Sequence, residues 1–125
     1  MRKSLTSLGE TEMEVLHHVW SLGKASVADV RERVLEERDV AYTTIMTVMK
    51  NLANKGYLKY TKQGNSYIYS AAIEPESVQY NLVGRLVDKV FKGSTADLVQ
   101  TLVKNEQLSE KDRREIKKMI DSMEE

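Results

Sequence analysis

The stretch YTTIMTVMKNLAN, residues 42–54, has the spacing of an amphipathic helix with a polar outer face. Its apolar residues recur at i, i+3, i+4 and i+7, the positions that face a core; they are Ile45, Val48, Met49 and Leu52. At about 100° per residue the opposite side is polar, and it holds Thr43, Thr47, Lys50 and Asn54, with Thr44, Met46 and Asn51 on the flanks. Gly56 is predicted to end the helix in the left-handed conformation.

Two more helices are predicted before this one. Acidic residues fill the first turns of Glu10–Leu22, and Gly23 follows its last turn, as is typical of a helix end. Ser26 and Asp29 form a capping-box variant, which predicts a second helix from this point to about Glu37. The second and third helices are therefore close in sequence, as in a helix-turn-helix.

A β-hairpin is predicted directly after the third helix. The segment 57–69 is rich in aromatic and β-branched residues on both sides of Gly64-Asn65. It also holds four of the chain's six tyrosines. Three helices followed by a hairpin, within about 70 residues, is the plan of a winged helix-turn-helix. The predicted fold is mainly α with a small β-hairpin.

Pro75 is the one proline of the chain. Short elements with glycines and tyrosines precede it, and a helical tail with periodic apolar residues follows it. This change predicts a winged-helix domain over residues 1–74 and a helical domain over residues 75–125. The tail reads as helices over about 77–91, 95–104 and 110–123. A segment of about 50 residues cannot bury three apolar stripes well, so we expect it to pair with the tail of a second chain; folding back on its own N-terminal domain is the alternative. The predicted dimer interface is Val83, Leu86, Val87, Val90, Leu98, Leu102, Ile116, Met119, Ile120 and Met123.

Charge is balanced overall, with 19 basic and 19 acidic residues, but it is not evenly distributed. Between Val40 and Ile73 there is no Asp or Glu, and there are four lysines. Such a segment could face phosphates while acids elsewhere balance the total. A chance lack of acids in a small helix and hairpin is the alternative.

The composition of the chain argues against several other classes of protein. With no Cys, disulfides, zinc ribbons and thiol catalysis are excluded. No apolar run approaches 18 residues, so no membrane span is expected. The start, Met1–Ser4, is not followed by the apolar stretch of a secretory signal, and we expect a cytoplasmic protein. The adjacent His17 and His18 are poorly placed to share a metal on a helix. No paired carboxylates, phosphate loop or activated nucleophile stand out, so we expect no enzyme activity, no cofactor and no metal.

The third helix carries groups suited to DNA. In a helix-turn-helix the second helix of the pair lies in the major groove. Threonine can bond to phosphates or bases, asparagine can read adenine, and lysine can bind phosphates. The tip of the hairpin, residues 62–66, is expected near DNA. The residues predicted to contact DNA are Thr43, Thr47, Lys50, Asn51, Asn54, Lys55, Lys59, Lys62 and Asn65. As alternatives, Thr43 and Thr47 are ordinary solvated residues, and Lys59 and Lys62 guard an edge strand.

From Leu8 to Met123 the sequence resembles the penicillinase repressors of the BlaI/MecI type. The matching stretches are Leu8-Gly9, Glu14–Leu16, Val19-Trp20, Ala41–Met49, Leu52, Lys55-Gly56, Gly64, Tyr67–Ser70, Phe91–Ser94, Leu98-Val99 and Leu108-Ser109. The resemblance implies a winged-helix domain, a helical dimerisation tail and repression from a palindromic operator, with β-lactam-resistance or cell-wall-stress genes as targets. It also implies DNA contacts at Thr44 and Thr47.

The sequence departs from that family at two points, and it lacks a feature of a related copper-responsive branch. Many members have Arg where this chain has Asn51, so one potential phosphate or guanine contact is missing. The well-studied repressors are cleaved at an Asn-Phe bond by a pathway with a membrane sensor protease. Thr101-Leu102 stands at that place here, so the same cleavage is left open for this chain, with Thr101-Leu102 as its candidate site. The copper-responsive branch has a C-terminal cysteine pair, and this chain has none. The zero net charge and the tyrosine-rich hairpin leave an alternative function open, a winged-helix protein–protein adaptor without sequence-specific DNA binding.

Overall fold

The computed structural model describes residues 8–123, and Met1–Ser4 lie outside this range. Contacts group the chain into two compact units, one up to Asn81 and one from Leu82 onward, and each is described by itself. The division falls inside helix α4 (Pro75–Val90). The domain boundary predicted between residues 74 and 75 stays a prediction.

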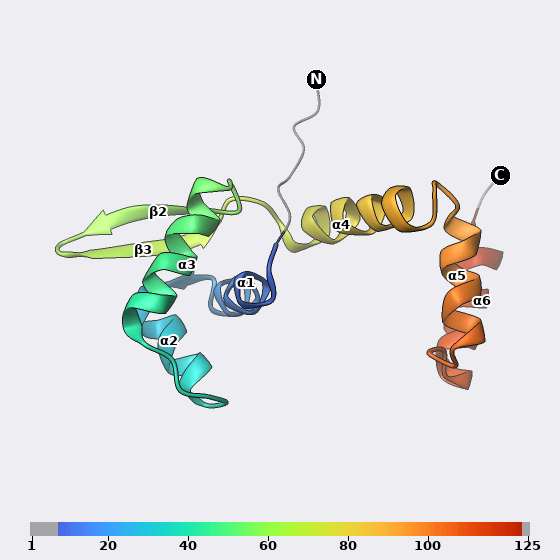
Figure 1. Ribbon diagram of the computed structural model, residues 1–125, viewed down its shortest axis with the longest axis horizontal. Helices are drawn as coiled ribbons and strands as arrows, with labels where there is room; N and C mark the ends of the chain where they lie inside the picture. Colours follow the sequence, from blue (N-terminus) through green and yellow to red (C-terminus); the bar gives the residue numbers. More distant parts are fainter. Residues whose placement is uncertain (1–7, 124–125) are drawn as a thin grey trace, which may run out of the picture. The chain divides into compact units, whose positions relative to one another are not determined.

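Three helices, α1 (Glu10–Leu22), α2 (Val27–Leu35) and α3 (Tyr42–Asn54), pack against one another in the N-terminal unit (Figure 1). The capping box predicted at the start of α2 is confirmed. The Asp29 N–H donates to Ser26 Oγ at 3.1 Å, and the Ser26 N–H donates to the Asp29 carboxylate at 2.9 Å. These bonds satisfy two backbone donors of the first turn, and so they set where α2 begins.

The hairpin lies beside α3 and consists of β2 (Leu58–Gln63) and β3 (Ser66–Ala71), joined at Gly64, which has φ +62° (Figure 1). A third strand, β1 (Lys24–Ala25), pairs with the other edge of β3 and gives the sheet order β1-β3-β2. The sequence did not predict β1, because two residues between helices show no alternation. The expected mainly α fold, with three helices before a small hairpin, is confirmed.

The core of the N-terminal unit fixes the orientation of α3. Its fully buried side chains come from these three helices, from the residue before β2 and from the first turn of α4; they include Leu16, Val19, Val30, Val34, Ile45, Met49, Leu52, Tyr57 and Val78. Val48, which the spacing placed in the core, is only half-buried. Because one side of α3 is held in this core, its other side is necessarily presented outward.

We expect Leu52→Ala to lower the free energy of unfolding of the N-terminal unit by about 2–5 kcal/mol, since Leu52 is fully buried and its loss leaves a cavity. Urea denaturation followed by the fluorescence of Trp20, the chain's one tryptophan, measures this change. Asn51→Ala, on the exposed side of the same helix, is the control and should change the free energy by no more than about 0.5 kcal/mol. Equal effects of both variants would contradict this account of the core.

The C-terminal unit contains the second part of α4 together with α5 (Thr95–Lys104) and α6 (Glu110–Asp121). Serine caps begin both later helices, because Ser94 Oγ accepts from the Asp97 N–H and Ser109 Oγ accepts from the Asp112 N–H. Among the described residues, neither α5 nor α6 has a buried side chain. The exposed apolar residues of these helices and the turn after them are Val99, Val103, Met119, Ile120 and Met123. Their apolar stripes are thus uncovered in a single chain.

No helix within the described residues 8–123 is long and apolar enough to cross a membrane.

Candidate nucleic-acid interface

The predicted polar face of α3 lies at the surface. Ile45, Met49 and Leu52 are fully buried, and the residues on the other side of the helix are exposed. Those exposed residues are Thr43, Thr44, Thr47, Lys50, Asn51 and Asn54. Every α3 side chain that the sequence proposed for DNA contact is therefore available to a partner, and the polar face spans the length of the helix.

The two faces of the hairpin differ in chemistry. The register pairs Tyr60 with Tyr69 and Lys62 with Tyr67, so all four side chains lie on one face. The ring of Tyr60 meets that of Tyr67 edge to face at 5.1 Å, and its centroid lies 5.4 Å from that of Tyr69. By strand alternation Lys59 lies on the reverse face. Lys59 and Lys62 thus point to opposite sides of the hairpin, although the sequence grouped them together.

A groove of about 450 Å³ lies between the tyrosine face of the hairpin, the start of α2 and one side of α3. From α3 it is lined by residues at intervals of three to four, which form one stripe of a helix. The lining residues are Ser26, Val27, Ala28, Tyr42, Met46, Lys50, Ala53, Asn54, Tyr60, Asn65, Ser66, Tyr67 and Tyr69. Two residues predicted from the recognition helix, Lys50 and Asn54, thus line the same groove as Asn65 of the hairpin tip.

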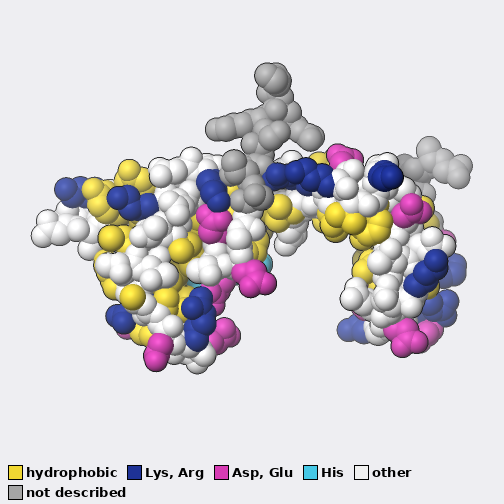
Figure 2. Space-filling model, viewed as in Figure 1, with side chains coloured by type: hydrophobic (Ala, Val, Ile, Leu, Met, Phe, Trp, Pro, Cys, Tyr) yellow, Lys and Arg dark blue, Asp and Glu magenta, His cyan; other side chains and the backbone are white. Residues whose placement is uncertain are grey.

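The surroundings of the groove favour anions. Among the described residues that line it, Lys50 is the one that carries a charge, and none is Asp or Glu. Burial raises the pKa of Tyr69, and the nearby hydroxyls of Tyr60, Tyr67 and Tyr42 raise it further, so Tyr69 adds no charge to the groove near pH 7. On the face shown in Figure 2, acidic side chains gather over α1 and α2 and not over the hairpin.

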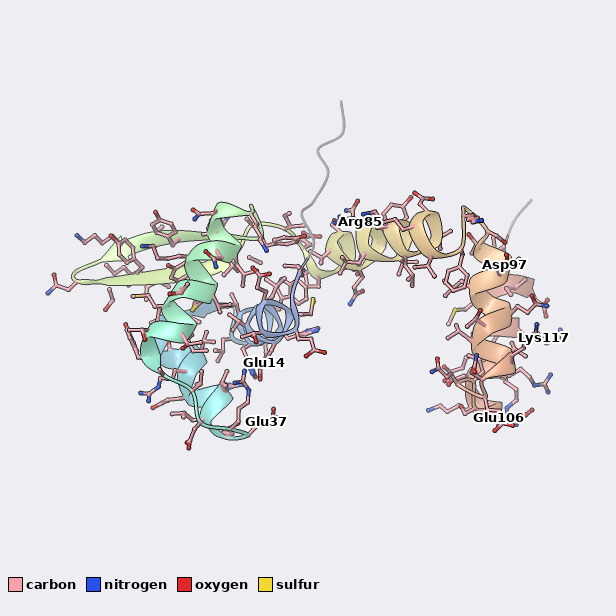
Figure 3. The ribbon with its side chains drawn as sticks, viewed as in Figure 1. Glu14, Glu37, Arg85, Asp97, Glu106 and Lys117 are labelled. Carbon is pink, nitrogen blue, oxygen red and sulfur yellow. The ribbon has the colours of Figure 1, made fainter. Side chains whose placement is uncertain are left out.

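Two labelled acids illustrate this separation. Glu14 projects from α1, where it pairs with Arg38 at 2.6 Å, and Glu37 lies in the turn after α2 (Figure 3). Neither residue is on the hairpin or on α3. The balanced charge of the whole chain therefore coexists with a surface on α3 and the hairpin that lacks acids, as residues 40–73 predict.

Lys55, which the sequence predicted to contact DNA, forms an ion pair with Glu12 of α1. It follows α3 directly, and its Nζ lies 2.8 Å from Glu12 Oε1 at the start of α1. The same carboxylate oxygen accepts the Gly9 N–H at 3.0 Å. Partial burial by itself raises the pKa of Glu12, but the Gly9 N–H and the Lys55 ammonium together outweigh burial and lower the pKa below its ordinary value of 4.5. The phosphate contact expected of Lys55 stays a prediction, and the ion pair gives this side chain a structural contact instead.

Glu12→Gln should lower the free energy of unfolding by about 0.5–1 kcal/mol at pH 7, because it removes the ion pair but keeps an acceptor for Gly9. The folded-state pKa of Glu12 is lowered, so this stabilisation is present above pH 4.5 and is lost as the pH falls through the folded pKa. Urea denaturation at several pH values measures the difference. Glu10→Gln, an exposed change in the same turn, is the control. A difference that persists unchanged at pH 3 would contradict the assignment.

The remaining predicted residues lie outside the groove. Thr101 and Leu102 are inside α5, where Thr101 Oγ1 donates to the Asp97 carbonyl at 2.9 Å.

Of the predicted dimer residues, Val87 is already buried within the chain, whereas Leu98, Leu102 and Ile116 are half-buried. The other members of that set are exposed: Val83, Leu86, Val90, Met119, Ile120 and Met123.

The His17 ring meets Trp20 edge to face at 5.3 Å, and residues 8–123 contain no cluster of three or more metal-binding side chains.

Sequence reasoning missed the part of the groove that comes from other elements. The spacing of Tyr42, Met46 and Lys50 is four residues, and this period could have indicated a second stripe on α3. The contribution of Ser26 and Val27 had no comparable signal, because it depends on how α2 packs against α3.

Comparisons with known proteins point to one family. A family model described as the penicillinase repressor matches residues 8–122. The chain is 26% identical over 113 residues to the methicillin resistance regulatory protein MecI of Mammaliicoccus sciuri, which covers 90% of this chain and 92% of that protein.

Solved structures show the same fold. The DNA-binding domain of the repressor BlaI superposes with a TM-score of 0.53 at 23% identity, over 59% of this chain and 90% of that one. Monomeric Bacillus licheniformis BlaI in complex with the blaP half-operator gives a TM-score of 0.51 at 23% identity, over 60% of this chain and 92% of that one. The winged-helix arrangement predicted from the sequence is thereby confirmed.

Proposed function

Because the chain belongs to the penicillinase repressor family, we propose that it represses transcription by binding an operator in double-stranded DNA. One observation carries the proposal. The exposed polar face of α3 and the tyrosine face of the hairpin, which also carries Lys62, adjoin one groove, and none of the described residues that line this groove is acidic. The BlaI half-operator complex supports it by likeness of fold. Within such a repressor no catalytic group is needed.

Residues on α3 are proposed to read the bases. With α3 in the major groove, Thr43, Thr47 and Asn51 lie on its outward side, where threonine methyl and hydroxyl groups and the asparagine amide can meet base edges. Thr44, also exposed, extends this set along the flank that does not line the groove. Asn51 offers an amide in place of a guanidinium, and amides favour adenine whereas guanidinium groups favour guanine.

Phosphate contacts are proposed on both sides of the groove. Lys50 on α3 and Lys62 on the hairpin can each neutralise one phosphate of the strand that passes over the groove. The first turn of α2 also lines the groove, and the N-terminal end of a helix carries partial positive charge. These contacts fix the position of α3 on the duplex but carry no sequence information.

The chain is proposed to act as a homodimer through its C-terminal unit. The uncovered apolar residues of α5 and α6 are the support, because stripes of this kind are usually covered by a partner. Twofold symmetry would present two copies of α3 to a palindromic operator. The same proposal places the chain in the cytoplasm and has repression relieved by cleavage at Thr101-Leu102 through a membrane sensor protease. Cleavage requires local opening of α5. Among the described residues α5 has no buried side chain that would oppose this opening.

Fluorescence anisotropy with labelled promoter DNA and a random duplex tests the proposal. Lys50 and Lys62 in both chains of a dimer neutralise about four phosphates, so log affinity should fall against log salt with a slope of about −3.6 or steeper. Promoter DNA should bind at least about a thousandfold more tightly than random DNA. Equal binding of both duplexes would contradict a specific operator, and no binding of either would leave the adaptor function, which the exposed tyrosines of the hairpin favour.

A further inference from the structure

The groove beside α3 is rich in tyrosine. Four of the chain's six tyrosines line it: Tyr42, Tyr60, Tyr67 and Tyr69. Three of them are about half exposed, at 46% for Tyr42, 53% for Tyr60 and 45% for Tyr67. Contiguous exposed apolar surface of this kind marks binding sites, and tyrosine combines an apolar ring with a polar end.

Its size suits a small molecule. Small-molecule sites are concave, have volumes of about 300–1,000 Å³ and combine apolar walls with a few polar groups. The groove has about 450 Å³, and Met46, Val27 and Ala28 add apolar surface to the four rings. Three elements contribute to the walls, namely the start of α2, α3 and the hairpin, so the space is formed by the fold and not by one loop.

The polar groups select an anion. Lys50, Asn54 and Asn65 are among the residues that line the groove, and their side chains end in an ammonium and two amides. A carboxylate bound there would gain charge-assisted hydrogen bonds. A cation would meet the charge of Lys50, and none of the described lining residues is an acid that could hold it. The tyrosine rings and the one cationic residue of the described lining, Lys50, together favour a ligand with an aromatic body and an acidic edge.

We propose that this groove is a binding site for a planar aromatic carboxylate, which competes with DNA. The competition rests on the proposed function, because Lys50 and Asn54 are assigned to DNA contacts as well; the binding itself does not. When one side chain serves two ligands, each ligand weakens the other by the same factor. The site would therefore allow a small metabolite to relieve repression directly.

Calorimetric titration of the full chain with 2-naphthoate tests the binding. We expect one molecule per chain and at least about tenfold weaker binding of the neutral 2-naphthamide, because it cannot form the charge-assisted bond. Lys50→Met should also weaken 2-naphthoate at least about tenfold, and Tyr60→Ala should weaken both probes alike. Lys59→Met, on the reverse face of the hairpin, is the matched control and should leave both affinities unchanged.

Undetectable binding of 2-naphthoate, or binding that Lys50→Met does not alter, would overturn the site. Equal affinities for the acid and the amide would overturn its preference for anions. Undetectable binding would leave only DNA as the proposed occupant of the groove.

Competition is tested by anisotropy with the promoter duplex in the presence of 2-naphthoate, against an equal concentration of sodium chloride, since salt alone weakens DNA binding. The apparent Kd for DNA should rise by the factor 1 + c/Kd, where c is the free concentration of 2-naphthoate and Kd is the dissociation constant of 2-naphthoate measured by calorimetry. A probe that binds without changing DNA affinity would overturn the competition. A chain that binds 2-naphthoate but no DNA would refute the repressor function while the site stands, so the two failures are distinguishable.

Discussion

Thr47→Ala combined with Lys50→Glu is expected to lower operator affinity about a hundredfold or more. The first change removes a hydroxyl and a methyl group from the outward side of α3, and the second replaces a phosphate-binding ammonium with a repelling carboxylate. Each such loss amounts to about 1–3 kcal/mol, and their sum gives the expected factor. Both residues are exposed, so the fold should be retained. Fluorescence anisotropy measures affinity, and circular dichroism verifies the fold.

The matched control is Lys59→Glu, which makes the same charge change on the reverse face of the hairpin. It should weaken binding only severalfold, through the general field. If this control weakened binding as much as the double change, net charge and not the face of α3 would determine affinity. If the double variant kept full affinity for the operator, the proposed role of α3 would be refuted.

Ile120→Asp is expected to convert the proposed dimer to a monomer and to weaken binding to a complete palindromic operator by about 10²–10⁴-fold. Ile120 is 59% exposed on α6, and a carboxylate there cannot be buried against a second chain without a partner for its charge. Affinity for a half-operator should not change, because α3 is untouched. Sedimentation at micromolar concentration reports the oligomeric state, and anisotropy with complete and half sites reports the affinities.

Lys111→Asp provides the control for this variant. Lys111 is exposed on α6 and lies nine residues before Ile120, which places it on the opposite side of the helix. That variant should remain a dimer. A dimer that survives Ile120→Asp would place the interface elsewhere, and a wild-type monomer at micromolar concentration would refute the dimer altogether.

The helices could be predicted because their ends have local signals. The bounds of α1 and α3 follow from apolar spacing and from Gly23 and Gly56, both of which have positive φ. A capping box is a contact between residues three apart, so Ser26 and Asp29 revealed the start of α2. Strand β1 is too short to show a period, and its pairing with β3 joins residues far apart in the sequence.

The candidate site was only partly predictable for the same reason. Helical geometry alone placed Thr43, Thr47 and Lys50 on one exposed face. The contact between Lys55 and Glu12 spans 43 residues, and no local pattern could separate Lys55 from the other lysines. The groove depends on the packing of the hairpin and α2 around α3, which is a property of the tertiary structure.

The uncovered apolar residues of α5 and α6 have a consequence for dosage. If two chains must pair before these residues are covered, the amount of dimer at low concentration varies with the square of the amount of chain. A twofold fall in expression then lowers the dimer about fourfold, and the response of a promoter to the supply of repressor becomes steeper than proportional. Cells could therefore change transcription strongly through a modest change in synthesis or turnover of this chain.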